Sequence, residues 1–204
     1  MHPSLGDYID RAALHIGEIA DERRSLLDEV ARFVSSKRRE PGAVAALTFI
    51  CTHNSRRSQM AQLWAAAAAA HHGIDQVRTY SGGTAVTAFD PRAVAAMQRA
   101  GFAIEGSEGD NPRYRATFDQ GGPVVECFSK TYDDPVNPAQ GFAAIMTCSD
   151  ADEACPVVFG AEFRVPLRYD DPKTADGTSE EAAVYDARCL QIATEMLCLF
   201  SKVV

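Results

Sequence analysis

The sequence predicts an α/β fold, a doubly wound parallel sheet with helices on both faces, preceded by an N-terminal helical extension. Two observations support this prediction. Apolar runs rich in β-formers alternate with stretches of helical periodicity from residue 45 to the C-terminus, which is typical of parallel sheets built from strand–helix–strand units. The chain also has 204 residues, 46% of them hydrophobic, which is enough for one core of ordinary size.

The predicted extension occupies residues 1–42 and consists of two amphipathic helices. Their apolar residues recur at helical spacing: Leu5, Ile9, Ala12, Ile16 and Ile19, then Leu26, Leu27, Val30, Phe33 and Val34. Such helices need an apolar surface to cover, either on the same chain or on another subunit. The sequence therefore leaves the oligomeric state open.

The alternating part of the chain has eight predicted elements. They are strand 45–50, helix 57–72, strand 77–81, helix 90–100, strand 142–148, a short cysteine loop, strand 163–169 and helix 179–202. Asp90 and Pro91 are an N-cap followed by proline at the first helical position, and Gly101 ends that helix. Thr178 and Glu181 have the spacing of a capping box. Ligands of such a sheet bind at the carboxyl ends of its strands.

One segment at such a strand end carries chemistry. It reads Cys51-Thr52-His53-Asn54-Ser55-Arg56-Arg57-Ser58. Backbone N–H groups at a helix start lack intrahelical partners and lie at the positive end of the helix dipole, so they bind an anion. The same field, together with Arg57, stabilises a thiolate at Cys51. The segment therefore predicts an oxyanion site, formed by residues 52–58, over a cysteine nucleophile.

Individual residues of this loop fit that interpretation. Arg57 can hold two anion oxygens in a fixed fork. Asn54 tolerates the left-handed backbone angles of a tight anion nest, and the Ser58 hydroxyl can donate to the thiolate. The alternative for Cys51 alone is a core cysteine, because cysteine is often buried. Arg56 either strengthens anion binding or is a solvated charge.

The segment Cys51–Ser58 resembles the signature of low-molecular-weight protein tyrosine phosphatases and of the thioredoxin-coupled arsenate reductases built on the same fold. Three later motifs resemble that superfamily in the same order: Ser81-Gly82-Gly83-Thr84, Asp90-Pro91-Arg92-Ala93-Val94 and Asp170-Asp171-Pro172. The resemblance implies a catalytic domain over residues 43–204 with an insert at about 106–141. It also implies that Asp171 is a general acid; the alternative is a turn aspartate, common before proline.

A second resemblance concerns the later cysteines. The segment Thr147–Pro156 is similar to the one that carries the second and third redox cysteines of the thioredoxin-coupled arsenate reductases. It implies that Cys148 forms a disulfide with Cys51 and so supplies the two electrons that reduce arsenate, and that Cys155 then passes the disulfide to thioredoxin. The alternative is that Cys148 is the last core residue of its strand and that Cys155 is also structural.

Two further segments bear on substrate and insert. Phosphatases of this superfamily place aromatic residues after the late proline, whereas this chain has Lys173-Thr174-Ala175, which favours a small inorganic oxyanion. Within the insert, the β-forming alternation of Val124–Tyr132 predicts a strand or flap near the site. Cys127 in that stretch is either a half-buried strand cysteine or a competing resolving thiol. Cys189 and Cys198 are predicted core residues of the last helix.

Composition excludes several function classes. The net charge is −8, and residues 149–181 hold nine acidic against three basic side chains, so nucleic acid is not an expected partner. No run approaches the roughly 20 apolar residues of a membrane span, and the N-terminus lacks a signal-peptide core; we expect a cytoplasmic protein. Six cysteines without a compact framework fit reduced thiols. No histidine has zinc-ligand spacing with them, so neither metal nor cofactor is expected.

Three functions remain from the sequence. The first is a thioredoxin-linked arsenate reductase, an oxidoreductase of arsenic detoxification. The second is a phosphatase for phosphotyrosine or a small phosphomonoester, with Cys51 as nucleophile, Arg57 as clamp and Asp171 as acid, and with Cys148 and Cys155 protecting the nucleophile from overoxidation. The third is a non-catalytic regulator that binds an anion or senses redox state.

Overall fold

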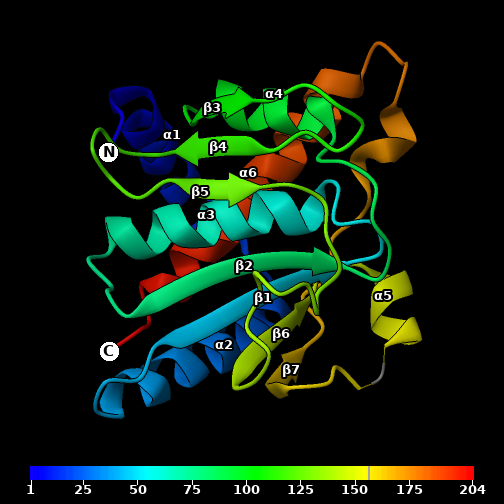
Figure 1. The fold of residues 1–204 in the computed structure, drawn as a ribbon. Coiled ribbons are helices and arrows are strands. Elements are labelled where there is room, and N and C mark those ends of the chain that lie inside the picture. Colours follow the sequence, from blue (N-terminus) through cyan, green and yellow to red (C-terminus); the bar gives the residue numbers. More distant parts are fainter. Residues whose placement is uncertain (156) are drawn as a thin grey trace.

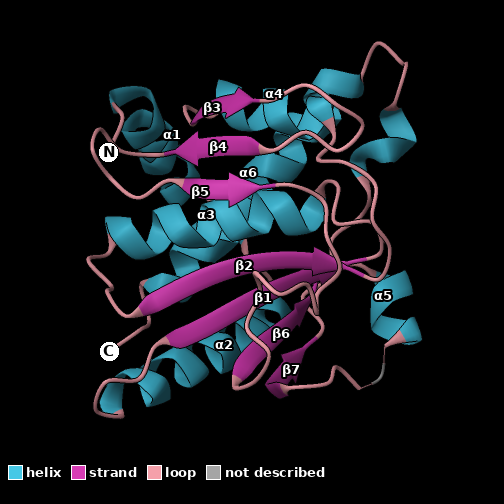
Figure 2. Cartoon of the chain, in the orientation of Figure 1, coloured by secondary structure: helices cyan, strands magenta, loops and turns pink. Residues whose placement is uncertain are grey.

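A four-stranded parallel sheet forms the centre of the computed structural model, which describes residues 1–155 and 157–204. Its strand order is β2-β1-β6-β7, and every neighbouring pair is parallel. The strands are β1 (Ala45–Cys51), β2 (Val77–Gly83), β6 (Phe142–Met146) and β7 (Ala161–Val165). The β1 and β2 arrowheads point to the same edge of the sheet (Figure 2). The predicted doubly wound α/β fold is confirmed.

The alternation of side chains along β1 separates two faces of the sheet. Leu47 and Phe49 belong to the larger hydrophobic cluster, whereas Ile50 belongs to a smaller cluster on the opposite face. The larger cluster is covered by α2 (Asp21–Arg39), α3 (Arg57–His71) and α6 (Glu181–Phe200). The smaller one is covered by α5 (Ser149–Ala154) and by the chain around Tyr132 and Val158. Figure 1 shows α5 near the end of the sheet to which β2 points.

The predicted N-terminal helices are confirmed. They are α1 (Pro3–Leu14) and α2, joined by the 3-10 turn η1 (Ile16–Glu18). Leu5, Ile9 and Leu27 are fully buried and share the larger cluster with α6, so the apolar surface that these helices cover lies on the same chain. The division of the chain at residue 42 stays a prediction.

A buried ion pair ties α2 to α6. Arg23 donates to Glu195 from Nε at 2.9 Å and from Nη2 at 2.8 Å, and only 3% of the Glu195 side chain is exposed. The same carboxylate accepts from the Tyr169 hydroxyl at 2.7 Å and from Gln191 at 3.1 Å. This ion pair thus attaches the N-terminal extension to buried polar residues of the last helix.

The one tryptophan of the chain joins α1 to α3. Trp64 is fully buried, stacks on Tyr8 with 5.3 Å between ring centroids, and meets the edge of Phe102 at 5.0 Å. Its indole N–H donates to the Cys189 sulfur at 3.2 Å. Cys189 and Cys198 are both buried in α6, as predicted.

A second, antiparallel sheet has the order β3-β4-β5. Its strands are β3 (Ala103–Gly106), β4 (Tyr114–Thr117) and β5 (Val125–Cys127), and Figure 1 shows it beside α3 and α4 (Pro91–Arg99). The strand predicted within residues 124–132 is confirmed for β5 only. Cys127 is fully buried rather than half-buried, and burial raises the pKa of its thiol to about 12, which disfavours a resolving role.

Two helix starts differ from prediction. The predicted cysteine loop is helical from Ser149 to Ala154, because Asp150 and Asp152 in the first turn complement the helix dipole and Cys148 caps the helix, its sulfur accepting from the Ala151 N–H at 3.4 Å. Near α6, the Thr178 hydroxyl accepts from the Glu180 N–H at 3.2 Å. The predicted capping box is therefore wrong, since α6 begins only at Glu181.

The start of α4 agrees with prediction. The Asp90 carboxylate accepts from the Arg92 N–H at 2.9 Å, and Pro91 occupies the first turn. Gly101 after the helix has a φ of +108°, which only glycine adopts readily. None of the helices in residues 1–155 and 157–204 combines the length and the apolar content that a membrane crossing requires.

Candidate active site

Cys51 lies at the carboxyl end of β1 and faces the start of α3. Its Sγ is 3.1 Å from the Ser58 hydroxyl, which accepts from the Asn54 side-chain amide at 2.9 Å. Because Asn54 fills an acceptor position of that hydroxyl, the Ser58 proton is free to point at the sulfur. Asn54 has a φ of +46°, the left-handed backbone that the sequence predicts. The loop thus places a hydroxyl donor beside the Cys51 sulfur.

The glycine motif at the end of β2 packs directly under this loop. Gly83 pairs with Cys51 across the sheet. A Cβ on Gly83 would lie 2.7 Å from the Thr52 carbonyl oxygen and 2.8 Å from the Asn54 nitrogen. Both are backbone atoms and have no room to move, so this position requires glycine. The Thr84 N–H also donates to the Thr52 carbonyl at 2.9 Å.

The chain that leaves β5 braces the other side of the loop. The Ser129 hydroxyl donates to the His53 carbonyl at 2.8 Å, and the Lys130 N–H donates to the Asn54 side-chain oxygen at 3.0 Å. These contacts fix the carbonyl and amide groups whose directions set the curvature of the loop. The segment from the predicted insert therefore lies against the site, as a support.

Arg57 and Asp171 lie in contact above the loop. Arg57 donates from Nη2 to Asp171 at 2.9 Å and from Nη1 to the Tyr169 carbonyl at 3.0 Å. These bonds use two of the five N–H groups of the guanidinium. Asp171 also caps the 3-10 turn η2 (Pro172–Ala175) by accepting from the Lys173 N–H at 3.1 Å. Asp171 is therefore a turn residue that caps η2, and its carboxylate is also the ion-pair partner of Arg57.

The charge state of Asp171 follows from its surroundings. Burial raises the pKa of this carboxyl, but the Arg57 charge and the hydrogen bonds from Arg56 and the Lys173 N–H lower it, and the net pKa is below the usual value. Asp171 is therefore ionised at neutral pH in this site.

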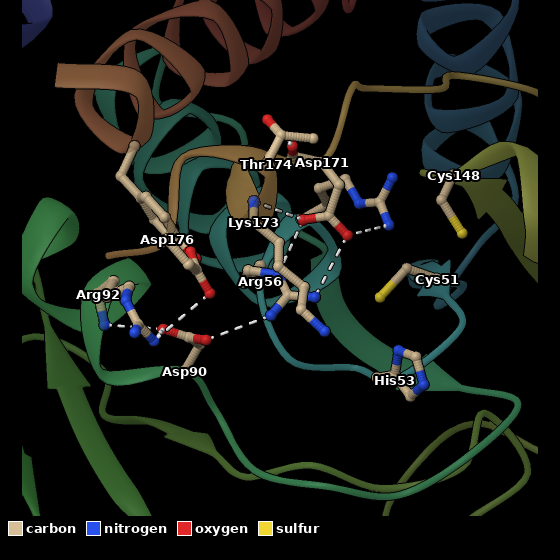
Figure 3. Close-up of polar contacts among 12 residues, drawn as sticks. Cys51, His53, Arg56, Asp90, Arg92, Cys148, Asp171, Lys173, Thr174 and Asp176 are labelled. Atoms are coloured by element: carbon tan, nitrogen blue, oxygen red, sulfur yellow. Dashed lines mark hydrogen bonds and ion pairs between the residues drawn. The ribbon is translucent and has the colours of Figure 1, made fainter. Parts of the chain in front are cut away.

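Arg56 is not a solvated charge. It is 9% exposed and donates to both oxygens of Asp171, at 2.9 and 3.2 Å, and to Asp90 at 3.2 Å. Figure 3 shows its guanidinium between the two carboxylates. Of the two alternatives for Arg56, the solvated charge is wrong, and binding of an anion by Arg56 stays a prediction.

Cys148 lies beside residues 51–58, which we call the nucleophile loop after the predicted role of Cys51. It follows β6, the neighbour of β1, and its sulfur is 3.5 Å from the Thr52 hydroxyl. Cys51 and Cys148 share the smaller cluster and lie next to each other in Figure 3. Cys155 ends α5, packs against the same cluster and is the one cysteine of the six that is not buried. Pro156, which ends the cysteine motif, lies outside the described residues.

Two residues of the site were not singled out for it from the sequence. Tyr169 holds Arg57 through a backbone carbonyl, for which no sequence signal exists. Asp90 was predicted only as a helix cap, yet it also accepts from Arg56 and its N–H donates to the Ser55 carbonyl at 2.9 Å. The sequence does contain one signal for Asp90: it caps a helix that packs near the loop, which places its carboxylate close to the site.

The sequence of the chain has relatives among known proteins. Residues 46–116 match the family described as low molecular weight phosphotyrosine protein phosphatase. An arsenate reductase from Bacillus licheniformis is 33% identical over 133 residues, which are 65% of this chain and 78% of the relative. An arsenate reductase from Bacillus subtilis is 31% identical over the same shares.

Solved structures agree on the fold. A low molecular weight phosphotyrosine phosphatase from Vibrio cholerae O395 is 16% identical with a TM-score of 0.51, over 77% of this chain and 95% of the other. A mutant of YwlE from Bacillus subtilis is 15% identical with a TM-score of 0.53, over 77% and 97%.

The relatives by sequence identify the chain as an enzyme, and the loop of residues 51–58 is its candidate oxyanion site. By sequence, the chain belongs to the low-molecular-weight protein tyrosine phosphatase superfamily, within the group that contains the Bacillus arsenate reductases.

Proposed function

We propose that this enzyme is an arsenate reductase that works through a cysteine thiolate and a disulfide relay. The observation that carries the proposal is the placement of Cys148 beside the nucleophile loop, with its sulfur 3.5 Å from the Thr52 hydroxyl. Cys155, which is not buried, lies one short helix away. A phosphatase needs neither thiol for turnover, whereas a reductase needs both. The similarity to two arsenate reductases supports the same function.

The reaction balances with the thiols present and one external dithiol. The Cys51 thiolate attacks arsenic, and one arsenate oxygen leaves as water after protonation. The Cys148 thiolate then attacks the Cys51 sulfur, and the electrons of the sulfur–arsenic bond stay on arsenic, which leaves as arsenite. Cys155 next attacks Cys148 and frees Cys51. A protein dithiol reduces the resulting Cys148–Cys155 disulfide and is itself oxidised.

Arg57 and the backbone N–H groups of the loop of residues 52–58 are the proposed oxyanion ligands. An arsenate dianion at this place competes with Asp171 for Arg57 and repels the Asp171 carboxylate. Both effects raise the pKa of that carboxyl toward protonation. Asp171, whose pKa is lowered by its arginine partners, thus becomes able to donate a proton once substrate is bound.

Thioredoxin is the proposed dithiol. The partial exposure of Cys155 supports this, because exchange requires a sulfur that another protein can reach. A cytoplasmic location is proposed with it, since thiols stay reduced there.

The test is a single-turnover trap. With Cys155→Ser, one equivalent of arsenate should yield one arsenite and a Cys51–Cys148 disulfide, found by peptide mapping. With Cys148→Ser, no normal turnover should complete. Cys198→Ser, a buried α6 cysteine, is the matched control and should cycle like the wild type. Finding no arsenate-dependent disulfide among the three cysteines would end the reductase proposal.

The second candidate is a phosphatase, which the family match over residues 46–116 favours. It predicts aryl phosphate hydrolysis through a phosphocysteine, unaffected by Cys148→Ser or Cys155→Ser under reducing conditions. The exposed side chains after Pro172 are Lys173 and Thr174, which offer no aromatic slot for a phenyl ring. Inactivity in both assays would favour an anion-binding or redox-sensing regulator.

A further inference from the structure

Arg56 forms a bridge between two carboxylates that belong to different elements. Its Nε and Nη2 hold the two oxygens of Asp171 in a bidentate pair, at 2.9 and 3.2 Å, while Nη1 reaches Asp90 at 3.2 Å. All three nitrogens of the guanidinium are thus engaged with carboxylates. The bidentate pair with Asp171 fixes the direction of its carboxylate as well as the distance.

The Asp90 end of this bridge is firmly held. Its carboxylate caps α4 through the Arg92 N–H, and its own N–H donates to the Ser55 carbonyl of the nucleophile loop. Arg92 also lies 3.6 Å from Asp90, and 9% of Asp90 is exposed. The bridge therefore starts from a point that is fixed relative to Cys51.

The Asp171 end is shared by two arginines with different tasks. Arg57 lies in the loop proposed to bind the oxyanion, so substrate competes with Asp171 for it. Arg56 has no such competing task in the proposed reaction. When substrate draws Arg57 away, Arg56 is the charged side chain that still holds Asp171.

We propose that Arg56 is a positioning residue that holds Asp171 over the nucleophile loop by anchoring it to Asp90. Arg56 acts through Asp171 and not as an oxyanion ligand. The inference rests on the proposed function insofar as an oxyanion binds at Cys51. Residues of an anion-binding loop are expected to contact the anion directly, whereas Arg56 contacts the carboxylates of Asp171 and Asp90.

The test is a double-mutant cycle on arsenate reduction, with Arg56→Gln, Asp171→Asn and the double variant. Arg56→Gln should lower kcat about tenfold, within the coupling range of contacting residues, while KM for arsenate changes less than about threefold, because the lost contact is not with substrate. In the Asp171→Asn background, the same change should cost less than about twofold. Arg56→Lys should restore only part of kcat, since an ammonium cannot form the fork.

Two further single variants test the Asp90 contact and provide a control. Asp90→Asn, which weakens the anchor without touching Asp171, should reproduce part of the Arg56→Gln effect and add little to it. Arg99→Gln, an exposed arginine paired with Asp186, should behave like the wild type. A rise in KM at unchanged kcat in Arg56→Gln would overturn the inference and make Arg56 an oxyanion ligand. Additive effects of Arg56→Gln and Asp171→Asn would overturn it as well.

A readout that needs no turnover separates this inference from the proposed function. The ¹³C shift of the Asp171 carboxyl across pH, assigned with Asp171→Asn, should have a higher midpoint in Arg56→Gln than in the wild type or Arg99→Gln. The groups that face Asp171 are Arg56, Arg57 and the Lys173 N–H, while Asp90 and Tyr185 act on Arg56. An unchanged midpoint refutes the inference; a wild type that does not reduce arsenate refutes the function only. If Arg56→Gln does not fold, the kinetic cycle and the pH titration of the Asp171 carboxyl are carried out with Arg56→Lys and Asp90→Asn instead.

Discussion

Replacing Arg23 by methionine should destabilise the protein by about 3 kcal/mol. The change leaves the Glu195 carboxylate, 3% exposed, with two neutral donors in place of its charged partner. Removing one partner of a buried pair costs about 3–5 kcal/mol. The Arg23 side chain is 19% exposed, so water reaches the pair and we expect the lower end of that range. Methionine keeps an apolar stem and a good helix propensity, so the lost charge dominates.

The assay is urea unfolding of the wild type and of two arginine-to-methionine variants. Arg99→Met is the matched control, because Arg99 also donates from Nε and Nη2 to one carboxylate, that of Asp186, but both side chains are more than 40% exposed. Exposed pairs contribute about 0–1 kcal/mol. The midpoint should shift much more for Arg23→Met than for Arg99→Met, at similar m-values.

A double variant checks the cause. Arg23→Met with Glu195→Gln removes both charges and should be less destabilised than the sum of the single changes by more than about 1 kcal/mol. Equal costs for Arg23→Met and Arg99→Met, or strictly additive costs in the double variant, would refute the reasoning that burial makes this pair strong.

Other perturbations have definite expected outcomes. Ser58→Ala removes the donor to Cys51, and since a hydrogen bond to a charged group contributes about 1.5–3 kcal/mol, iodoacetamide should alkylate Cys51 at least about tenfold more slowly at pH 6; an unchanged rate would show that Ser58 does not stabilise the thiolate. Gly83→Ala, whose Cβ meets backbone atoms at 2.7 Å, should abolish phosphate protection of Cys51, whereas retained protection would mean that the loop can shift. Asp171 has a folded pKa below its unfolded value of 3.8, so its stabilisation is full above pH 3.8 and is lost as the pH falls through the folded pKa; Asp171→Asn should flatten this acid limb in unfolding experiments, and an unaltered limb would contradict the pairing. Cys127→Ser should leave arsenate turnover unchanged, because that thiol is buried; a loss of turnover in the folded variant would restore its resolving role.

The parts of the site that the sequence predicts are local in the chain. Cys51, Asn54 and Ser58 lie within eight residues, and the strand before them and the helix after them are strong patterns. Strand and helix periodicities fix where such a segment turns. The left-handed Asn54 and the Ser58–Cys51 contact therefore follow from neighbouring residues alone, without knowledge of the rest of the fold.

The parts that the sequence does not predict depend on distant partners. Arg56 contacts Asp90 and Asp171, which lie 34 and 115 positions away. Nothing near Arg56 in the chain distinguishes a buried bridge from a solvated charge, because the carboxylates come together only when α4 and η2 pack against the loop. The sequence does not predict the helical α5 for a related reason: a helix of six residues is too short to show the i, i+3, i+4, i+7 recurrence of apolar residues.

The stacking of Tyr8 on Trp64 gives the protein an intrinsic optical reporter. The indole of Trp64 is shielded from water and donates a hydrogen bond to the Cys189 sulfur. Since it is the one indole of the chain, any change in tryptophan fluorescence reports on this environment. If α1 leaves the body of the molecule, the indole loses its ring partner and becomes hydrated, and its emission moves to longer wavelength. Docking and release of the N-terminal helix can thus be followed in real time without a dye, in the same cuvette as the enzyme reaction.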